Sequence, residues 1–331
     1  MNIPILQFLI SAIIIIIAGH YLTRSADKIA DLTGWGKMFV GSLLLAGATS
    51  LPELMVDIKA VKMNLPDLAV GDLLGSSLFN LLILATLDFT FPSAFRRTAF
   101  SPAFLHHSLS AVLTIILTAI VGVAITSKLE TSIFGVSIFS WAIVIIYFFG
   151  IRLTYMDGAK NEVQKIENTF SSAKKNKLIF SFLYFLASTV IIILTAPFLV
   201  NSADQIAQMS GLGHTFVGTT LVALSTSLPE LVATIAAFRM GSPDLALGNI
   251  FGSNAFNMIL FVPLDFFYAN NLFSSVRGVN AVTAFGIIAA TGTAVMGQLY
   301  RKKERSRFIE PSSEAVVAII VLIFFLIYNL K

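Results

Sequence analysis

Cysteine is absent from this 331-residue sequence, which excludes disulfide bonds and thiolate-bound metals. Histidine is scarce as well: only four are present, and none has the spacing of a zinc or copper site. Charged residues make up 12% of the chain, about half the usual share in a soluble domain. No Walker-type or other phosphate-cradling sequence occurs, so we expect no nucleotide, no resident metal cofactor and no enzymatic chemistry.

Apolar residues make up 56% of the chain, and the mean hydropathy is +0.85. Stretches of roughly 20 apolar residues, the length that crosses a hydrocarbon core, recur along the whole sequence. We therefore expect an all-α integral membrane protein in contact with the lipid bilayer, with no nucleic-acid partner. The ten predicted transmembrane helices lie near residues 4–31, 36–58, 67–89, 103–125, 131–152, 177–205, 213–238, 244–268, 278–299 and 312–330.

One short sequence occurs twice, as ATSLPEL at Ala48–Leu54 and as STSLPEL at Ser225–Leu231. The copies are 177 residues apart, and at this offset residues 25–88 match residues 202–265 at 32 of 64 positions. Each copy places a glutamate, Glu53 or Glu230, inside an apolar segment, where an acidic residue costs about 2.5 to 3.5 kcal/mol. A duplicated acidic site in a membrane protein points to cation transport.

Five spans per repeat is an odd number, so the second copy must enter the membrane from the opposite face. The prediction is therefore two inverted five-helix repeats, residues 1–153 and 177–331, joined by a polar cytoplasmic linker at 154–176. Basic residues support this topology, because 17 of the 22 fall in alternate loops and so mark the cytoplasmic side. Both termini are then expected outside a cell membrane, plasma or inner, and we expect a monomeric functional unit.

Four of the predicted helices contain a weak point near their middle. Pro52 and Pro229 lack an amide N–H and crowd the preceding turn, which predicts breaks in the second and seventh spans. Gly75-Ser76 and Gly252-Ser253 predict further breaks in the third and eighth spans. Carbonyl oxygens freed by such breaks are tolerated at membrane depth when they line a cavity or bind an ion.

Oxygen-bearing side chains accompany these predicted breaks. Ser50 and Glu53 are three residues apart, and Ser76 and Asn80 are four apart, so each pair shares one helix face. Carboxylate, amide and carbonyl oxygens suit Ca²⁺, and a less charged set suits Na⁺. One Ca²⁺, two Na⁺ or two protons would neutralise Glu53 and Glu230. If the empty, doubly charged site is too costly to reorient, the carrier moves only when loaded and is an antiporter.

At these residues the chain resembles the calcium/cation antiporter superfamily, and specifically its sodium/calcium exchanger branch. The family's GTSLPE-type motif is similar to Ala48–Glu53 and Ser225–Glu230, and its GNxxGSNxxN-type motif is similar to Gly71–Asn80 and Gly248–Asn257. The resemblance covers essentially the whole chain. It implies a ten-helix antiporter that works by alternating access, with Ca²⁺ and Na⁺ as the transported ions.

The resemblance also implies the ligands. Glu53 and Glu230 would bind Ca²⁺, with backbone carbonyls from Thr49 and Thr226. One sodium site would use Ala46, Thr49 and Ser76. The remaining implied residues are Ala223, Thr226, Ser253 and Asn254 for the other sodium site, and Ser50, Ser227, Asn80 and Asn257 for the central shell.

The sequence departs from the family pattern in three places. Asn257 stands where some relatives have aspartate, Asp72 where asparagine is usual, and Ser77 where the second repeat has Asn254. Asp72 falls on the site-facing stripe of its helix, as does Asp57, one turn after Glu53. We interpret Asp57 and Asp72 as an outer cation vestibule; the alternative is interfacial acids paired with Lys59 or Lys62.

Two other functions fit parts of the pattern. A Ca²⁺/H⁺ exchanger could use the same two glutamates, because two protons would neutralise them. A cation channel could line its pore with the broken helices, although antiparallel broken helices with central acids are typical of transporters. Transport that requires a counter-ion excludes the channel, and a response to Na⁺ rather than to pH excludes the proton exchanger.

Overall fold

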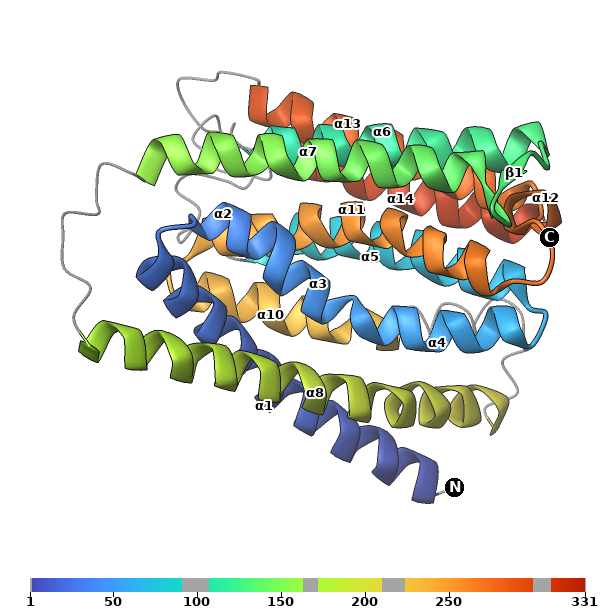
Figure 1. Ribbon diagram of the computed structural model, residues 1–331. Coiled ribbons are helices and arrows are strands. Elements are labelled where there is room, and N and C mark those ends of the chain that lie inside the picture. Colours follow the sequence, from blue (N-terminus) through green and yellow to red (C-terminus); the bar gives the residue numbers. More distant parts are fainter. Residues whose placement is uncertain (1, 91–106, 163–171, 210–223, 300–310, 331) are drawn as a thin grey trace. The chain divides into compact units, whose positions relative to one another are not determined.

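The computed structural model describes residues 2–90, 107–162, 172–209, 224–299 and 311–330. These segments are mostly helical (Figure 1). Spatial proximity groups the chain into two compact units, each built from both halves of the sequence. Unit 1 comprises residues 1–55 and 151–253, and unit 2 comprises residues 56–150 and 254–331.

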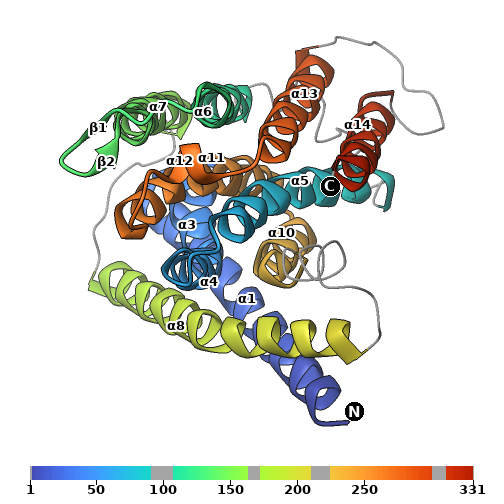
Figure 2. The same cartoon turned by 90° about the vertical axis from the view of Figure 1, so that its right-hand side faces the viewer.

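Unit 1 contains a pair of long helices and both copies of the duplicated motif. The helices α1 (Asn2–Thr33) and α8 (Ser172–Met209) cross each other obliquely and pack along much of their length (Figures 1 and 2). In the sequence α1 is followed directly by α2 (Lys37–Phe39), the π-helical turn η1 (Val40–Leu45) and α3 (Ala46–Thr49). The unit is completed by α10 (Leu228–Arg239), which packs on α1, and by the first part of α11 (Pro243–Phe267).

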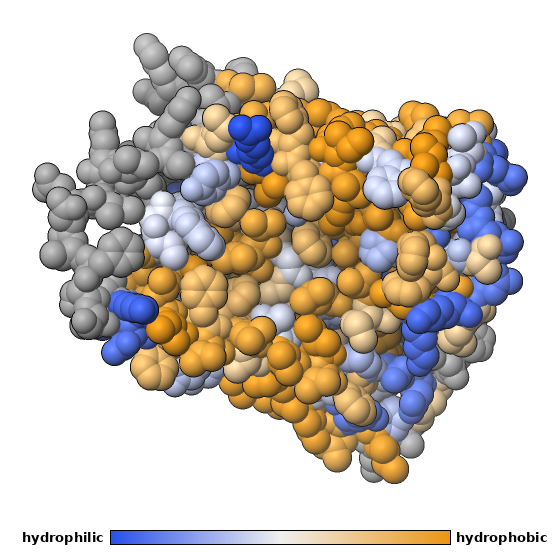
Figure 3. Space-filling model, viewed as in Figure 1, coloured by the Kyte–Doolittle hydropathy of each residue, from blue (hydrophilic) through white to orange (hydrophobic). Residues whose placement is uncertain are grey.

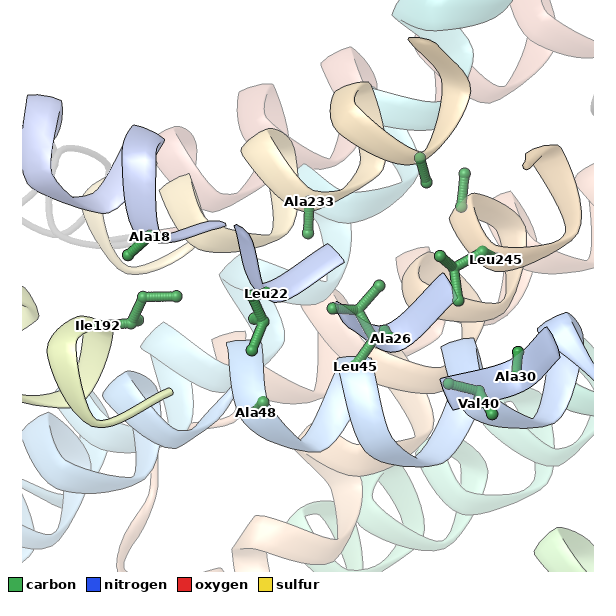
Figure 4. Close-up of a cluster of buried hydrophobic side chains, with 12 residues drawn as sticks. Ala18, Leu22, Ala26, Ala30, Val40, Leu45, Ala48, Ile192, Ala233 and Leu245 are labelled. Atoms are coloured by element: carbon green, nitrogen blue, oxygen red, sulfur yellow. The ribbon is translucent and has the colours of Figure 1, made fainter. Parts of the chain in front are cut away.

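Small side chains let the unit 1 helices approach one another closely. Ala18, Leu22, Ala26 and Ala30 of α1 meet side chains from η1, α3, α8, α10 and α11 in one buried cluster (Figure 4). Because lipid tails are as apolar as the core, such close packing rather than water exclusion holds membrane helices together. The outer surface is apolar too, since hydrophobic residues cover the face along which α8 runs (Figure 3).

Unit 2 is a helical group around α5 and α13. Its helices are most of α4 (Leu51–Lys62), α5 (Pro66–Thr90), α6 (Ser108–Ser127), most of α7 (Ile138–Glu162), the end of α11, α12 (Leu272–Ser275), α13 (Val279–Leu299) and α14 (Pro311–Asn329). α13 lies between α6 and α14 and also packs on α5 (Figure 2). Asp67 ties the start of α5 to the start of α13 by accepting bonds from Arg277 N and Asn280 Nδ2, each at 2.8 Å.

Seven described helices are long and apolar enough to cross a membrane, and the bent pair Lys37–Thr49 and Leu51–Lys62 raises the number to eight. The helix Ser313–Asn329 is apolar but shorter. The chain is therefore a multi-pass membrane protein. The predicted seventh span, 213–238, is described only from residue 224, so ten helices and their inversion stay a prediction, as do the repeat and linker boundaries.

One predicted span begins later than expected. Residues 132–137 form a hairpin of β1 (Ser132–Ile133) and β2 (Val136–Ser137), and α7 starts only at Ile138. Phe134 and Gly135 both have positive φ, which suits the tight turn between twisted strands. Buried Asp265 fixes the hairpin, accepting bonds from Ser137 N and Ser140 Oγ, each at 2.7 Å.

The predicted breaks at Gly75-Ser76 and Gly252-Ser253 are wrong. Both α5 and α11 run through these positions as continuous α-helices. Glycine and serine keep their amide N–H, so they weaken a helix by about 1 kcal/mol or less but need not interrupt it. Gly252 has another purpose: a Cβ there would lie 2.3 Å from Ser42 Cα, so only glycine lets α11 approach η1 this closely.

Candidate cation site

Both copies of the duplicated motif interrupt a helix, as the prolines predicted. α3 ends at Thr49, Ser50 has φ −90° and ψ 3°, and α4 begins at Leu51 with a bend of 42°. Ser227 has nearly the same conformation, φ −78° and ψ 2°, before α10 begins at Leu228. The prolines that follow sit in the first turn of the new helix, where no N–H is required.

This break places each glutamate in the first turn of a new helix. Glu53 belongs to the first turn of α4, and Glu230 to the first turn of α10. The N-terminal end of a helix carries partial positive charge, which favours an anion there. Both side chains are buried, with 0% and 1% of their surface exposed. A buried carboxylate needs compensating charge or hydrogen bonds, so both positions are costly ones.

The two motif copies meet directly in unit 1. The hydroxyl of Ser50, from the first copy, donates a 3.1 Å hydrogen bond to Oε1 of Glu230, from the second. Both residues are buried. Residues 180 positions apart in the chain therefore contribute to one polar cluster at the two helix breaks.

Thr49 and α11 extend this cluster. The hydroxyl of Thr49 lies 3.4 Å from Ser253 Oγ and donates to Asn249 Oδ1 at 3.4 Å. Asn249 is held in turn by its own Nδ2, which donates to Thr234 Oγ1 at 3.1 Å. The close glycine-mediated approach of α11 to η1 brings these side chains together. The sodium site of Ala46, Thr49 and Ser76 stays a prediction, and the hydroxyl contact between Thr49 and Ser253 adds a neighbour that the sequence did not show.

Unit 2 contains a second polar cluster, formed by α5 and the end of α11. Asn80 Nδ2 donates to Asn254 Oδ1 at 2.9 Å, and Asn254 Nδ2 donates to the carbonyl of Ser77 at 3.1 Å. Asn257 Nδ2 lies 3.4 Å from Ser77 Oγ. The amide oxygens of Asn80 and Asn257 are buried and accept no hydrogen bond from the described residues. Oxygens fixed in this way suit a cation ligand.

Ser77 is a residue that sequence reasoning undervalued. It was noted only as a departure from the family pattern, yet it orients two predicted ligands. Its carbonyl holds Asn254 and its hydroxyl holds Asn257. The available signal was position, since Ser77 lies directly beside Ser76 and one turn before Asn80.

The other predicted residues differ in how far the structure describes them. Thr226, Ser227 and Ser76 are buried, and Ser227 Oγ has no hydrogen-bond partner among the described residues. The carbonyl of Ala46 already accepts from Ser50 N at 3.0 Å and from Thr49 Oγ1 at 3.2 Å. Ala223 lies outside the described residues.

The chemistry of these clusters suits a hard cation. Their polar atoms are carboxylate, amide, hydroxyl and carbonyl oxygens, with no sulfur or imidazole ligand. The described residues contain no group of three or more acidic, histidine or cysteine side chains that could hold a metal. A site of one or two carboxylates supplemented by neutral oxygens can bind and release Ca²⁺ or Na⁺.

Comparison with known proteins shows the family of this chain. The family model described as sodium/calcium exchanger protein matches residues 3–156 and 180–330. The chain belongs to that family. Sodium/calcium exchanger proteins are antiporters, and therefore transporters rather than enzymes. The recognition made from the two motifs is confirmed.

Relatives in the sodium/calcium exchanger family differ in the ions that they are named for. The sodium/calcium exchanger MaX1 of Methanosarcina acetivorans is 27% identical over 300 residues, covering 78% of this chain and 81% of MaX1. The Ca(2+)/H(+) antiporter ChaA of Bacillus subtilis is 24% identical over 258 residues, covering 74% of this chain and 71% of ChaA.

A solved structure shares the family fold. The sodium-calcium exchanger NCX_Mj, in a crystal soaked with Na⁺, superposes with a TM-score of 0.71 at 20% identity, covering 99% of both chains. At this identity the likeness establishes the fold.

Proposed function

We propose that this protein is a secondary active antiporter that exchanges Ca²⁺ for Na⁺ by alternating access. The observation that carries the proposal is the Ser50–Glu230 hydrogen bond, because it joins the two copies of the motif at two buried helix breaks. A buried glutamate with a purely structural role would need neither a second copy of the motif nor a break in its helix. Membership of the exchanger family supports the same function.

The ligand roles follow from charge and position. Glu53 and Glu230 supply two negative charges, which one Ca²⁺ or two Na⁺ would neutralise. The hydroxyls of Ser50 and Ser227 lie at the breaks beside them and supply neutral oxygens. Carbonyl oxygens of Thr49 and Thr226 and amide oxygens of Asn80 and Asn257 stay predictions from the family pattern.

Neutral oxygens near the acids support Na⁺ as the counter-ion. Thr49 and Ser253 present two hydroxyls 3.4 Å apart, next to the amide of Asn249. Na⁺ accepts such a set with less charge than Ca²⁺ requires. These contacts support a part for Thr49 and Ser253 in Na⁺ binding. The two sodium sites that the family pattern implies, Ala46, Thr49 and Ser76 for one and Ala223, Thr226, Ser253 and Asn254 for the other, stay predictions.

Proton exchange is the second candidate. Asparagine occupies both 80 and 257, so Glu53 and Glu230 are the carboxylates left for the centre, and two protons could replace two Na⁺. The family relative from Bacillus subtilis is named a Ca(2+)/H(+) antiporter. The choice between the two depends on a measurement of coupling.

The test is Ca²⁺ uptake into liposomes that contain the purified full chain. With Na⁺ inside and none outside, we expect saturable Ca²⁺ uptake that stops when Na⁺ is replaced by a large organic cation. A pH gradient without Na⁺ should drive no uptake above protein-free liposomes. Uptake that follows the pH gradient and ignores Na⁺ would establish the proton exchanger, and uptake without any counter-ion would indicate a channel.

A further inference from the structure

Three polar residues of unit 2 differ from their counterparts in the second repeat, and all three are buried: Asp57, Asp72 and Ser77. The two acids are 1% and 3% exposed, less than the open outer vestibule interpreted from the sequence requires. Lys62, their alternative partner, places Nζ over the ring of Phe267, 4.7 Å from its centroid. Ser77, by contrast, contacts two predicted cation ligands of α11.

The hydroxyl proton of Ser77 is committed to its own helix. Ser77 Oγ donates to the carbonyl of Leu73, one turn earlier, at 2.9 Å. A hydroxyl has one proton, so toward any further neighbour Ser77 Oγ can only accept. Asn257 Nδ2 lies 3.4 Å from this oxygen and 3.5 Å from the Leu73 carbonyl. Both neighbours of the Asn257 amide are acceptors, so the amide presents its nitrogen to them and its oxygen elsewhere.

The backbone carbonyl of Ser77 fixes a second amide by the same rule. A carbonyl only accepts, so Asn254 turns Nδ2 toward it, at a distance of 3.1 Å. Asn254 Oδ1 is then left as an acceptor for Asn80, whose Nδ2 donates to it at 2.9 Å. The orientation of the Asn80 amide is therefore set from Ser77 through Asn254.

The outcome of this hydrogen-bond network is two amide oxygens without a donor. Oδ1 of Asn80 and Oδ1 of Asn257 are buried and accept no hydrogen bond from the described residues. A buried amide oxygen without a partner is costly unless a cation or another donor binds it. Amide oxygens are among the neutral ligands that Ca²⁺ takes.

We propose that Ser77 is a positioning residue for the transported cation: its hydroxyl holds the Asn257 amide so that the oxygen, and not the NH₂ group, is available to the ion. An asparagine, the residue at the equivalent position 254, has both a donor and an acceptor group and could meet either side of the Asn257 amide. Serine with its proton committed leaves one orientation. This role rests on the proposed function for the identity of the ion.

Ca²⁺ binding to Ser77 variants tests this role. Equilibrium dialysis with radioactive Ca²⁺, on the detergent-solubilised full chain, gives both the Kd and the amount of Ca²⁺ bound at saturation. Ser77→Ala should raise the Kd about three- to tenfold, as expected for the loss of one hydrogen bond, and leave the bound amount unchanged. Ser77→Thr and Ser77→Val have the same shape, and the threonine variant, which keeps a hydroxyl, should bind Ca²⁺ more tightly than the valine variant.

The variant Asn257→Asp separates orientation from packing. A carboxylate presents an oxygen whichever way it is turned, so in this background Ser77→Ala should change the Kd by less than about twofold. Ser181→Ala is the matched control, because the Ser181 hydroxyl of α8 also donates to a carbonyl one turn earlier at 2.9 Å. Its Kd should equal that of the wild type.

The other results would contradict the positioning role. A Kd that Ser77→Ala leaves unchanged, or raises equally in the Asn257→Asp background, would overturn it. Less Ca²⁺ bound at saturation with an unchanged Kd would overturn it too, since that result indicates fewer folded molecules. Ca²⁺ uptake into liposomes that ignores Na⁺, together with the expected Kd pattern, would contradict Na⁺ exchange and leave the role of Ser77 intact.

Discussion

Ser50 is the residue at which the two motif copies touch, and its hydroxyl fixes one oxygen of Glu230. Glutamate has several rotatable bonds, so an unrestrained carboxylate would have to be ordered when a cation binds. A side chain held in place before binding avoids that entropic cost, about 0.5 to 1.5 kcal/mol for a flexible side chain. Ser50 thus acts on affinity through preorganisation as well as through its own oxygen.

Removal of this hydroxyl should weaken Ca²⁺ binding. For Ser50→Ala we expect the half-saturating Ca²⁺ concentration for uptake into liposomes to rise roughly three- to tenfold, as the cost of reordering Glu230 predicts. Ser50→Thr keeps the hydroxyl and is the control, with a value close to that of the wild type. An unchanged half-saturating concentration in Ser50→Ala would show that the contact has no part in binding.

The contacts that could not be predicted from the sequence all join residues that are far apart in the chain. That Glu53, Glu230 and Ser50 are special could be predicted, because duplication and the prolines are visible in the sequence. The role of Ser77 could not, because it depends on which α11 side chain reaches α5. The engagement of Lys62 by Phe267 was likewise hidden, since the two residues are far apart in the chain.

At the scale of elements, the helix breaks and the glycines have different functions. The prolines begin new helices at Leu51 and Leu228, as their missing N–H predicted. Gly75 and Gly252 lie in unbroken helices, so the breaks predicted from glycine's low helix propensity do not occur. The close approach of another backbone to Gly252 could not be predicted, because helix propensity is a local property and that approach depends on tertiary packing. Gly41 and Gly248 lie at the same crossing: a Cβ on Gly41 would lie 2.6 Å from Leu245 O of α11, and a Cβ on Gly248 would lie 2.6 Å from Met38 O of α2.

A methyl group at this crossing should separate the helices. In Gly252→Ala the added Cβ would meet Ser42 Cα at 2.3 Å and Ser42 O at 2.5 Å, and backbone atoms cannot rotate away. We expect a loss of about 1 to 3 kcal/mol in stability, measured as a lower thermal unfolding temperature in detergent. Gly292→Ala is the matched control, because among the described residues no atom outside its own stretch of α13 lies within 4 Å of the Cβ position.

The outcome for that control decides the interpretation. Gly292→Ala should leave the unfolding temperature unchanged or raise it slightly, because alanine favours the helix by up to about 1 kcal/mol. Equal unfolding temperatures for the two variants would show that the crossing of η1 and α11 tolerates a wider spacing, and that glycine at 252 is not needed to bring Ser253 near Thr49.

At the scale of the whole molecule, transport requires two halves that present one cation centre to opposite sides of the membrane. The sequence predicts this from five spans per repeat and from the distribution of basic residues. The structure adds that the motif copies share a polar cluster through Ser50 and Glu230, and the family comparison adds the fold of an exchanger. Strict ion exchange follows if the centre is too highly charged to reorient empty.

The most direct test of this account is Na⁺-gradient-driven Ca²⁺ uptake by liposomes that contain Glu53→Gln or Glu230→Gln. Each change removes one of the two negative charges that balance Ca²⁺, so uptake should fall to the level of protein-free liposomes in both variants. Glu314→Gln, an exposed acid in the first turn of α14, should transport like the wild type. Retained exchange in either motif variant would contradict the assignment of the two glutamates as the transport centre.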